Sequence, residues 1–272
     1  MKVLSFDAHV LKLIALFGMV ANHVAIALAP AMPLWAVVLL YGFGGLTYVI
    51  MAYFVVEGYK HTSDLKKYIG RLFVFAVIAQ AFHPTVLGAT NIGTPIFLNI
   101  LFNIILALFV LYLYDTIKIR PLFWLLFVMA CIVSFAMDLG PIGVLVPLLY
   151  YAIKEEKRRR ILPGIIAGIY FLIFGAFAAI IPIMYLATGE FAEEVYFLTD
   201  SMGLHVYMMA AMPTFTLGCI LAALLIYNFN GKRGKHSKWL FYVFYPVHLA
   251  VIALIMVVLG ISGFNLFGFV QF

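Results

Sequence analysis

The apolar stretch LKLIALFGMVANHV, residues 11–24, contains a lysine and a histidine eleven residues apart. If it is helical, eleven residues make three turns plus about 20°, so Lys12 and His23 project from one face about 16 Å apart. Ionisable groups in a bilayer cost about 2.5–3.5 kcal/mol on insertion scales and indicate function by default. Lys12 could instead extend to the interface, and His23 could bond a neighbouring helix. With an unperturbed pKa near 6.5, His23 is suited to general base catalysis.

Further ionisable groups adjoin the next two apolar segments. Glu57 lies in VVEGYKHT, where it could act in catalysis or pair with Lys60 or Arg71. Arg71 lies five residues into the third segment, after Lys66 and Lys67. An arginine there could bind a phosphate group bidentately or simply flank the cytoplasmic end of a helix.

Two more histidines occur beside prolines. His248 follows Phe244-Tyr245-Pro246 and is expected near the middle of the membrane. Pro246 leaves a backbone carbonyl free, which favours a polar partner beside a cavity. His83 precedes Pro84 and is expected near the outer end of its segment, either lining an outer opening or lying at the interface.

The motifs of several enzyme classes are missing from the sequence. It contains no Walker loop, GxSxG, HExxH or cysteine–histidine zinc spacing, so nucleotide hydrolysis, serine hydrolysis and a metal site are not predicted. What remains is a set of buried bases next to basic residues. This layout favours an anionic donor that the basic residues attract from the cytoplasm, and whose reactive end reaches an imidazole.

The composition indicates the elements that position these residues. Of the 272 residues, 66% are hydrophobic and 10% are charged, and the mean hydropathy is +1.13. This predicts an all-α fold, a polytopic bundle of transmembrane helices in one domain, 1–272. The net charge of +6 comes from short basic clusters between apolar segments, so binding to the lipid bilayer is expected and nucleic acid is not.

Breaks at Gly, Pro, Asn or charged residues divide the chain into about nine candidate spans. They cover residues 6–29, 34–58, 66–83, 95–114, 121–136, 141–154, 163–187, 204–228 and 238–259. The fifth and sixth are short, and Asp138-Leu139-Gly140-Pro141 between them predicts a tight turn or a kink.

Charge supports this count. With nine spans every lysine and arginine outside them falls on one side, which the positive-inside rule places in the cytoplasm with the N-terminus. The C-terminus is then outside, and the apolar tail from residue 260 to 272 is expected at the outer interface.

Several segments together resemble the TraX family, which is associated with N-acetylation of pilin. They are the 11–24 stretch, EGYKHT, DLGPIGVLVPLLYYAIK, NGKRGK and FYPVH. The spacing of Lys12 and His23 is also similar to the first-helix motif of the membrane acyltransferase-3 group. The resemblance implies acyl transfer from cytoplasmic acetyl-CoA, with His23 catalytic and Lys12 contacting the donor or supporting the site. Glu57, Arg71 and His248 match family motifs.

One position departs from the family pattern, which commonly reads Asp-His where this chain has Asn22-His23. An amide offers no carboxylate to an imidazolium, so a charge-assisted base would need Asp7, Glu57 or another group supplied by the fold.

The leading hypothesis is a bacterial inner-membrane, acetyl-CoA-dependent acyltransferase that acts on an amine or hydroxyl of a pilin-like protein or cell-surface molecule. His23, Lys12, Glu57 and His248 are its predicted catalytic residues, and Lys12, Arg71 and Lys67 are the predicted acyl-CoA contacts. His23 could be a base or carry the acetyl group itself. The alternatives are a small proton-coupled transporter or permease, and a non-catalytic assembly factor.

Overall fold

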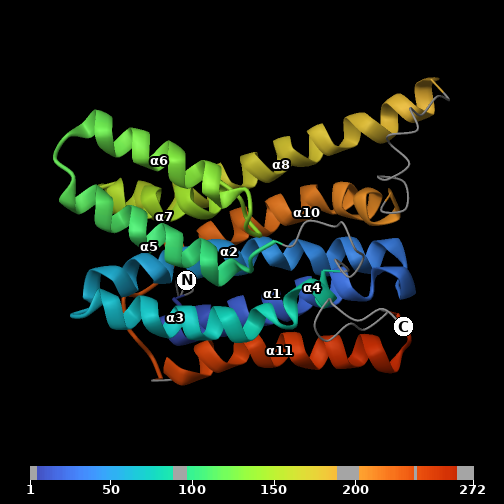
Figure 1. The fold of residues 1–272 in the computed structure, drawn as a ribbon, viewed down its shortest axis with the longest axis horizontal. Helices are drawn as coiled ribbons and strands as arrows, with labels where there is room; N and C mark the ends of the chain where they lie inside the picture. The colour runs from blue at the N-terminus through green and yellow to red at the C-terminus, as the bar shows by residue number, and fades with distance from the viewer. Residues whose placement is uncertain (1–4, 88–96, 189–201, 236–237, 262–272) are drawn as a thin grey trace.

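The computed structural model describes residues 5–87, 97–188, 202–235 and 238–261. Within these residues the regular structure is helical, with two isolated β-bridges, which confirms the all-α prediction. The long helices lie side by side (Figure 1). The helices are α1 (Ala8–Ala27), the 3₁₀ helix η1 (Ala29–Ala31), α2 (Leu34–His61), α3 (Leu65–Gln80), α4 (His83–Val86), α5 (Ile100–Thr116), α6 (Arg120–Ser134), α7 (Ile142–Ala152), α8 (Glu156–Thr188), α10 (Met202–Tyr227) and α11 (Lys238–Val258).

Five helices in the described part of the chain are long and apolar enough to cross a membrane: Ala8–Ala27, Leu34–His61, Glu156–Phe177, Ala210–Tyr227 and Trp239–Val258. The protein is therefore a multi-pass membrane protein. The apolar helices α5, α6 and α7 have 17, 15 and 11 residues. At 1.5 Å per residue they are about 26, 22 and 16 Å long, less than the ~30 Å of a hydrocarbon core. A count of nine crossings therefore stays a prediction.

The break between α6 and α7 is a turn. Gly140 has a φ of +56°, a conformation in which a side chain would be strained. Backbone bonds fix the turn against the segment that precedes α5, because Leu98 N–H donates to Ala136 O and Asp138 N–H donates to Leu98 O, both at 2.9 Å. The turn therefore places Asp138 beside the start of α5.

The basic segments of the described chain gather at one end of the bundle. Helices α2, α5, α7 and α10 end there, while α3, α6, α8 and α11 begin there, on the left of Figure 1. We call this the basic end, because the segments that join these helices hold the basic clusters. Its orientation toward the cytoplasm stays a prediction, and residues 262–272 of the C-terminal tail lie outside the described residues.

Side-chain caps set where three of the helices begin. Asp7 accepts a hydrogen bond from Val10 N–H at the start of α1, and Asp64 accepts one from Lys67 N–H at the start of α3, both at 2.9 Å. Asn99 caps α5 through Leu101 N–H at 3.1 Å. These bonds satisfy amide groups that a helix start leaves without partners.

Glycines allow α2 and α10 to pack closely. A Cβ at Gly45 would collide with the backbone carbonyl of Phe215, and one at Gly218 with the carbonyl of Gly42. Small residues at such crossings are typical of membrane helices, whose backbones can then approach each other.

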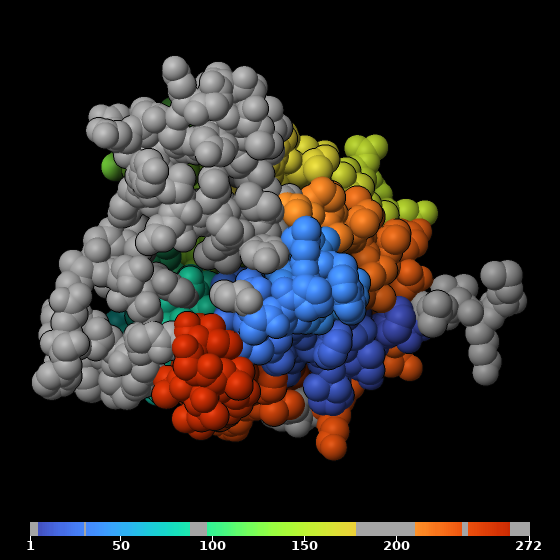
Figure 2. Space-filling view, turned by 90° about the vertical axis from the view of Figure 1, so that its right-hand side faces the viewer, coloured from blue at the N-terminus to red at the C-terminus, as the bar shows by residue number. Residues whose placement is uncertain are grey.

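At the end opposite the basic end, the N-terminal turns of α2 (blue) lie between the end of α11 (red) and α10 (orange), as Figure 2 shows.

We expect Gly218→Ala to destabilise the bundle by about 1–3 kcal/mol, because the added methyl group forces α2 and α10 apart. Thermal unfolding in detergent would show this as a lower apparent melting temperature. Gly70→Ala is the control, because a Cβ there meets nothing within 4 Å and α3 gains helix propensity. Equal melting temperatures for the two variants would contradict the close crossing.

A second buried cluster joins α1, α3 and α11. It includes Leu16 and Met19 of α1, Leu72 of α3, and Tyr245 and Leu249 of α11. Leu16 and Met19 lie on the same face of α1 as Lys12 and His23, because these positions are spaced by three or four residues. This cluster therefore turns the face of α1 that carries Lys12 and His23 toward α11.

Candidate functional site

Two histidines predicted to be functional are in direct contact. His23 Nδ1 of α1 lies 3.1 Å from His248 Nε2 of α11, and the two ring centroids are 5.0 Å apart. Each Nδ1 also bonds a backbone carbonyl one turn earlier: His23 bonds Met19 O at 2.9 Å and His248 bonds Phe244 O at 3.0 Å. Both side chains are thus fixed within the bundle.

The carbonyl partners indicate which ring nitrogens carry hydrogen when both histidines are neutral. A carbonyl only accepts, so each Nδ1 must carry hydrogen to make its bond. His248 Nε2 is then an acceptor facing His23 Nδ1–H. The Nε2 of His23 carries no hydrogen and bonds to no described residue. This nitrogen is the one that can accept a proton from a substrate.

A cavity of about 360 Å³ opens at the basic end between α1, α2, α3 and α11. Among the residues described, its lining has four lysine or arginine side chains, two histidines and no carboxylate. The basic residues are Lys12, Arg71, Arg233 and Lys235. We call this cavity the basic pocket. Its charge suits an anionic ligand.

Lys12 and Arg71 contribute to the basic pocket from helices α1 and α3. The Lys12 ammonium lies 4.9 Å from the centroid of the Phe54 ring of α2 and 5.3 Å from that of the Phe241 ring of α11, so it lies between these two helices. The Arg71 Nε is buried and has no hydrogen-bond partner among the described residues. A buried guanidinium donor without a partner fits a site that takes up an anion.

The loop after α10 brings Arg233 and Lys235 to the basic pocket. It pairs with the start of the chain through three backbone bonds: Phe6 N–H to Asn228 O, Asn230 N–H to Phe6 O and Ala8 N–H to Lys232 O. Gly234 then turns the chain with a φ of +67°, and a Cβ there would lie 2.6 Å from the Asp7 carboxylate. Only glycine suits this position.

An apolar region connects the basic pocket with the histidine pair. The pocket's inner wall includes Leu101 and Ile104 of α5. Leu101 belongs to the same buried cluster as Met19 and Tyr245. The Met19 carbonyl bonds His23, and the Tyr245 ring lies 5.5 Å from that of His248. The buried apolar cluster therefore lies between the basic pocket and the histidine pair.

Glu57 and Lys67 are not part of this arrangement. Glu57 Oε1 lies 3.4 Å from the Lys60 ammonium and 3.5 Å from the Arg159 guanidinium. Lys67 pairs with Asp64 at 3.2 Å, and its side chain is 78% exposed. The bond from Lys67 N–H, followed by its ammonium, lowers the pKa of Asp64. Neither residue lines the basic pocket, so the structure assigns both to ion pairs at the basic end.

Asn22 links α1 to α2 instead of supporting His23. Its amide donates to Tyr41 O at 3.1 Å. The two carboxylates considered for His23 lie elsewhere, because Asp7 caps the start of α1 and Glu57 binds Lys60 and Arg159. The structure therefore brings neither of them to the histidine.

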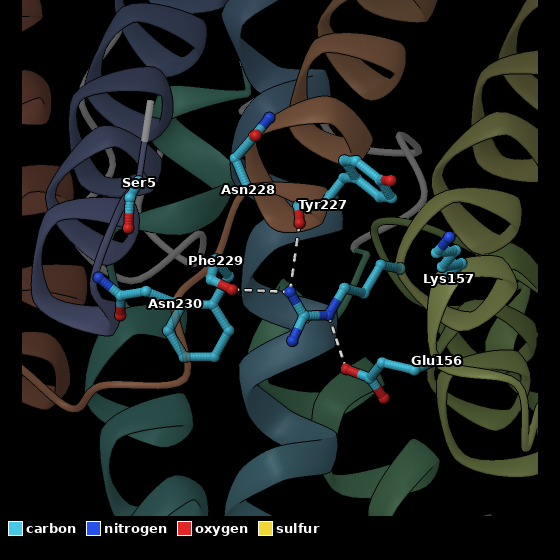
Figure 3. Close-up of a pocket in the computed structure, with 8 residues that line it drawn as sticks. Ser5, Glu156, Lys157, Tyr227, Asn228, Phe229 and Asn230 are labelled. Atoms are coloured by element: carbon cyan, nitrogen blue, oxygen red, sulfur yellow. Dashed lines mark hydrogen bonds and ion pairs between the residues drawn. The ribbon is translucent and has the colours of Figure 1, made fainter. Parts of the chain in front are cut away.

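A second hollow of about 550 Å³ lies at the surface near the end of α10 (Figure 3). Arg160 donates there to the carbonyls of Tyr227 at 3.2 Å and Phe229 at 2.7 Å, and to Glu156 at 2.6 Å. These bonds satisfy carbonyls at a helix end. Because Arg160 bonds to these carbonyls and to Glu156, a structural role explains this hollow.

Sequence reasoning missed Arg233 and Lys235 as members of the pocket. Their segment, NGKRGK, was recognised only as part of the resemblance. No periodicity could reveal their position, because they lie more than 200 residues after Lys12 and reach it through loop pairing.

A family model and a curated relative each match most of the chain. The family model described as "TraX protein" matches residues 7–256. The chain is also 28% identical, over 237 residues, to the "Probable fimbrial assembly protein FimC, serogroup H1" of Dichelobacter nodosus. That alignment covers 85% of this chain and 87% of the relative. No solved structure matches the chain.

Proposed function

The chain belongs to the TraX family, and on this premise we propose that it is a membrane acyltransferase that uses acetyl-CoA. The acceptor would be an amine or hydroxyl on a pilin-like protein or another cell-surface molecule. The fimbrial assembly name of the relative supports an acceptor of this kind. In this proposal the protein lies in the bacterial inner membrane with its basic end in the cytoplasm.

The observation that carries the proposal is the basic pocket. Its four cations would bind the phosphates of the donor, and the buried, unpartnered Arg71 Nε supplies a donor for a phosphate oxygen. The apolar inner wall at Leu101 would bind the uncharged arm that carries the acetyl group.

His23 would act as the general base. The acceptor nitrogen or oxygen bonds to the thioester carbonyl carbon while His23 Nε2 takes the proton that the acceptor releases. The carbon–sulfur bond then breaks, and the proton passes to the leaving sulfur to give the free thiol. His248 accepts a hydrogen bond from His23 Nδ1–H, which stabilises the imidazolium formed between these steps.

The proposal is tested with the purified protein in lipid vesicles. We expect transfer of labelled acetyl from acetyl-CoA to a peptide with a free N-terminal amine, and saturable binding of CoA. Vesicles without protein are the control. A folded protein that neither binds CoA nor transfers acetyl would refute the proposal.

A second candidate function is a non-catalytic assembly factor. It is favoured by the printed name of the relative, which refers to fimbrial assembly. Binding of a pilin-like peptide without CoA binding or acetyl transfer would support this candidate. A transporter would instead require CoA-independent flux of a solute across the vesicle membrane.

A further inference from the structure

The four cations of the basic pocket lack the carboxylate partners that other basic residues at the basic end have. Outside the pocket, an Asp or Glu lies 2.5–3.5 Å from each of Lys60, Lys67, Arg158, Arg159 and Arg160. In the described part of the chain, no carboxylate forms an ion pair with a cation of the pocket. Like charges gathered in this way repel each other, so the pocket favours a ligand with several negative charges.

The four cations lie at two depths. Lys12 and Arg71 are partly buried on helices, and Arg71 is six residues beyond the first residue of α3, about 9 Å along its axis. Arg233 and Lys235 are exposed on the loop after α10. Arg233 interacts electrostatically with Lys12, so the outer cations adjoin the inner ones. The pocket can therefore bind two anionic groups of one ligand, one deeper than the other.

The loop after α10 is shaped to hold the outer cations at the pocket. In addition to its backbone bonds with the start of the chain, Asn230 Oδ1 accepts a hydrogen bond from Lys232 N–H at 2.8 Å. Gly231 and Gly234 have φ values of +76° and +67°, so the chain turns on both sides of Arg233. Lys232, the neighbour of Arg233, does not line the pocket. Cations fixed in this way lose little freedom when a ligand binds.

The negative charge of CoA is also divided between two places. A diphosphate leads into the arm that carries the acetyl group, and a phosphate monoester lies on the ribose at the other end. A monoester carries about 1.5–2 negative charges at neutral pH and has three strong acceptor oxygens. Dephospho-CoA lacks this monoester but has the same diphosphate and arm.

We propose that Arg233 and Lys235 bind the ribose phosphate monoester and make the basic pocket specific for CoA over dephospho-CoA. The inference rests on the acyltransferase function proposed above. The arm enters the bundle past the apolar inner wall, so the diphosphate next to it binds the deeper cations, Lys12 and Arg71. The monoester at the far end of the ligand then meets the outer cations on the loop.

The test is equilibrium binding of CoA and of dephospho-CoA to the full chain in vesicles of phosphatidylcholine, whose headgroup has no net charge. Wild type should bind CoA roughly tenfold to a hundredfold more tightly than dephospho-CoA. Arg233→Met and Lys235→Met should each weaken CoA binding several-fold or more and leave the affinity for dephospho-CoA nearly unchanged. With acetyl-CoA as donor, KM should rise by the same factor while kcat stays constant.

Two further variants separate this role from general attraction by charge. Lys232→Met removes one positive charge from the same loop but not from the pocket, so it should affect neither ligand. Arg71→Met should weaken both ligands by similar factors, because the diphosphate is present in both. A double-mutant comparison of Arg233→Met with removal of the ligand's monoester then measures their coupling directly.

Other results would overturn the proposal. Equal affinity of wild type for the two ligands, with acetyl transfer intact, would refute the specificity but leave the acyltransferase function standing. Equal weakening of both ligands by Arg233→Met and Lys235→Met would show that the loop does not bind the monoester. A Lys232→Met effect as large as that of Arg233→Met would reduce the loop to long-range attraction. Failure of folded wild type to bind either ligand would refute the acyltransferase function, and this inference with it.

Discussion

Replacing His23 by alanine should lower acetyl transfer by about 10²–10⁴-fold, the usual range for a lost general base. The reason is its unprotonated Nε2, which the bonds of Nδ1 to Met19 O and His248 leave free to take a proton. CoA binding should remain, because the basic pocket does not contain His23. Initial rates with saturating acetyl-CoA and peptide measure the effect.

His248→Gln is the matched variant. It removes the ring that accepts from His23 Nδ1–H but leaves the bond to Met19 O, so we expect a smaller loss than for His23→Ala. Full activity of His23→Ala would refute the assignment of the base. Incubation with labelled acetyl-CoA but no acceptor separates the two roles of His23, since only a covalent carrier would retain label.

The second large effect concerns the donor. Arg71→Met should weaken CoA binding roughly tenfold to a hundredfold, because a hydrogen bond to a charged group contributes about 1.5–3 kcal/mol. Arg71 lines the basic pocket, and its Nε is buried there without a hydrogen-bond partner among the described residues. Equilibrium titration of CoA into the protein in vesicles measures the change, and the affinity should fall further as salt is added.

Lys67→Met is the control for this variant, because it removes one positive charge from the same helix. Lys67 is exposed and pairs with Asp64 outside the basic pocket, so its loss should leave CoA affinity nearly unchanged. Similar effects of both substitutions would mean that only the overall positive charge attracts the ligand. No effect of Arg71→Met would exclude the basic pocket as the donor site.

The class of fold could be predicted from the sequence because its signals are local. A high apolar content and breaks at Gly, Pro and charged residues determine where helices form and end. The residues 138–141 were expected to form a turn or a kink, and the structure has a turn with Gly140 at positive φ. The number of membrane crossings could not be decided in this way, because a helix as short as α7 can lie at several depths in the membrane.

The sequence by itself also determined that Lys12 and His23 share one face of α1, since helical periodicity relates residues on the same helix. Only the tertiary structure decided what each of them meets. His248 reaches His23 across 225 residues, Arg233 and Lys235 join Lys12, and Asp138 pairs with a buried His83. Glu57 and Lys67 instead form ion pairs outside the pocket. The physical reason is that contacts between helices depend on how close their backbones can pack, which small residues such as Gly45 and Gly218 permit and no local pattern specifies.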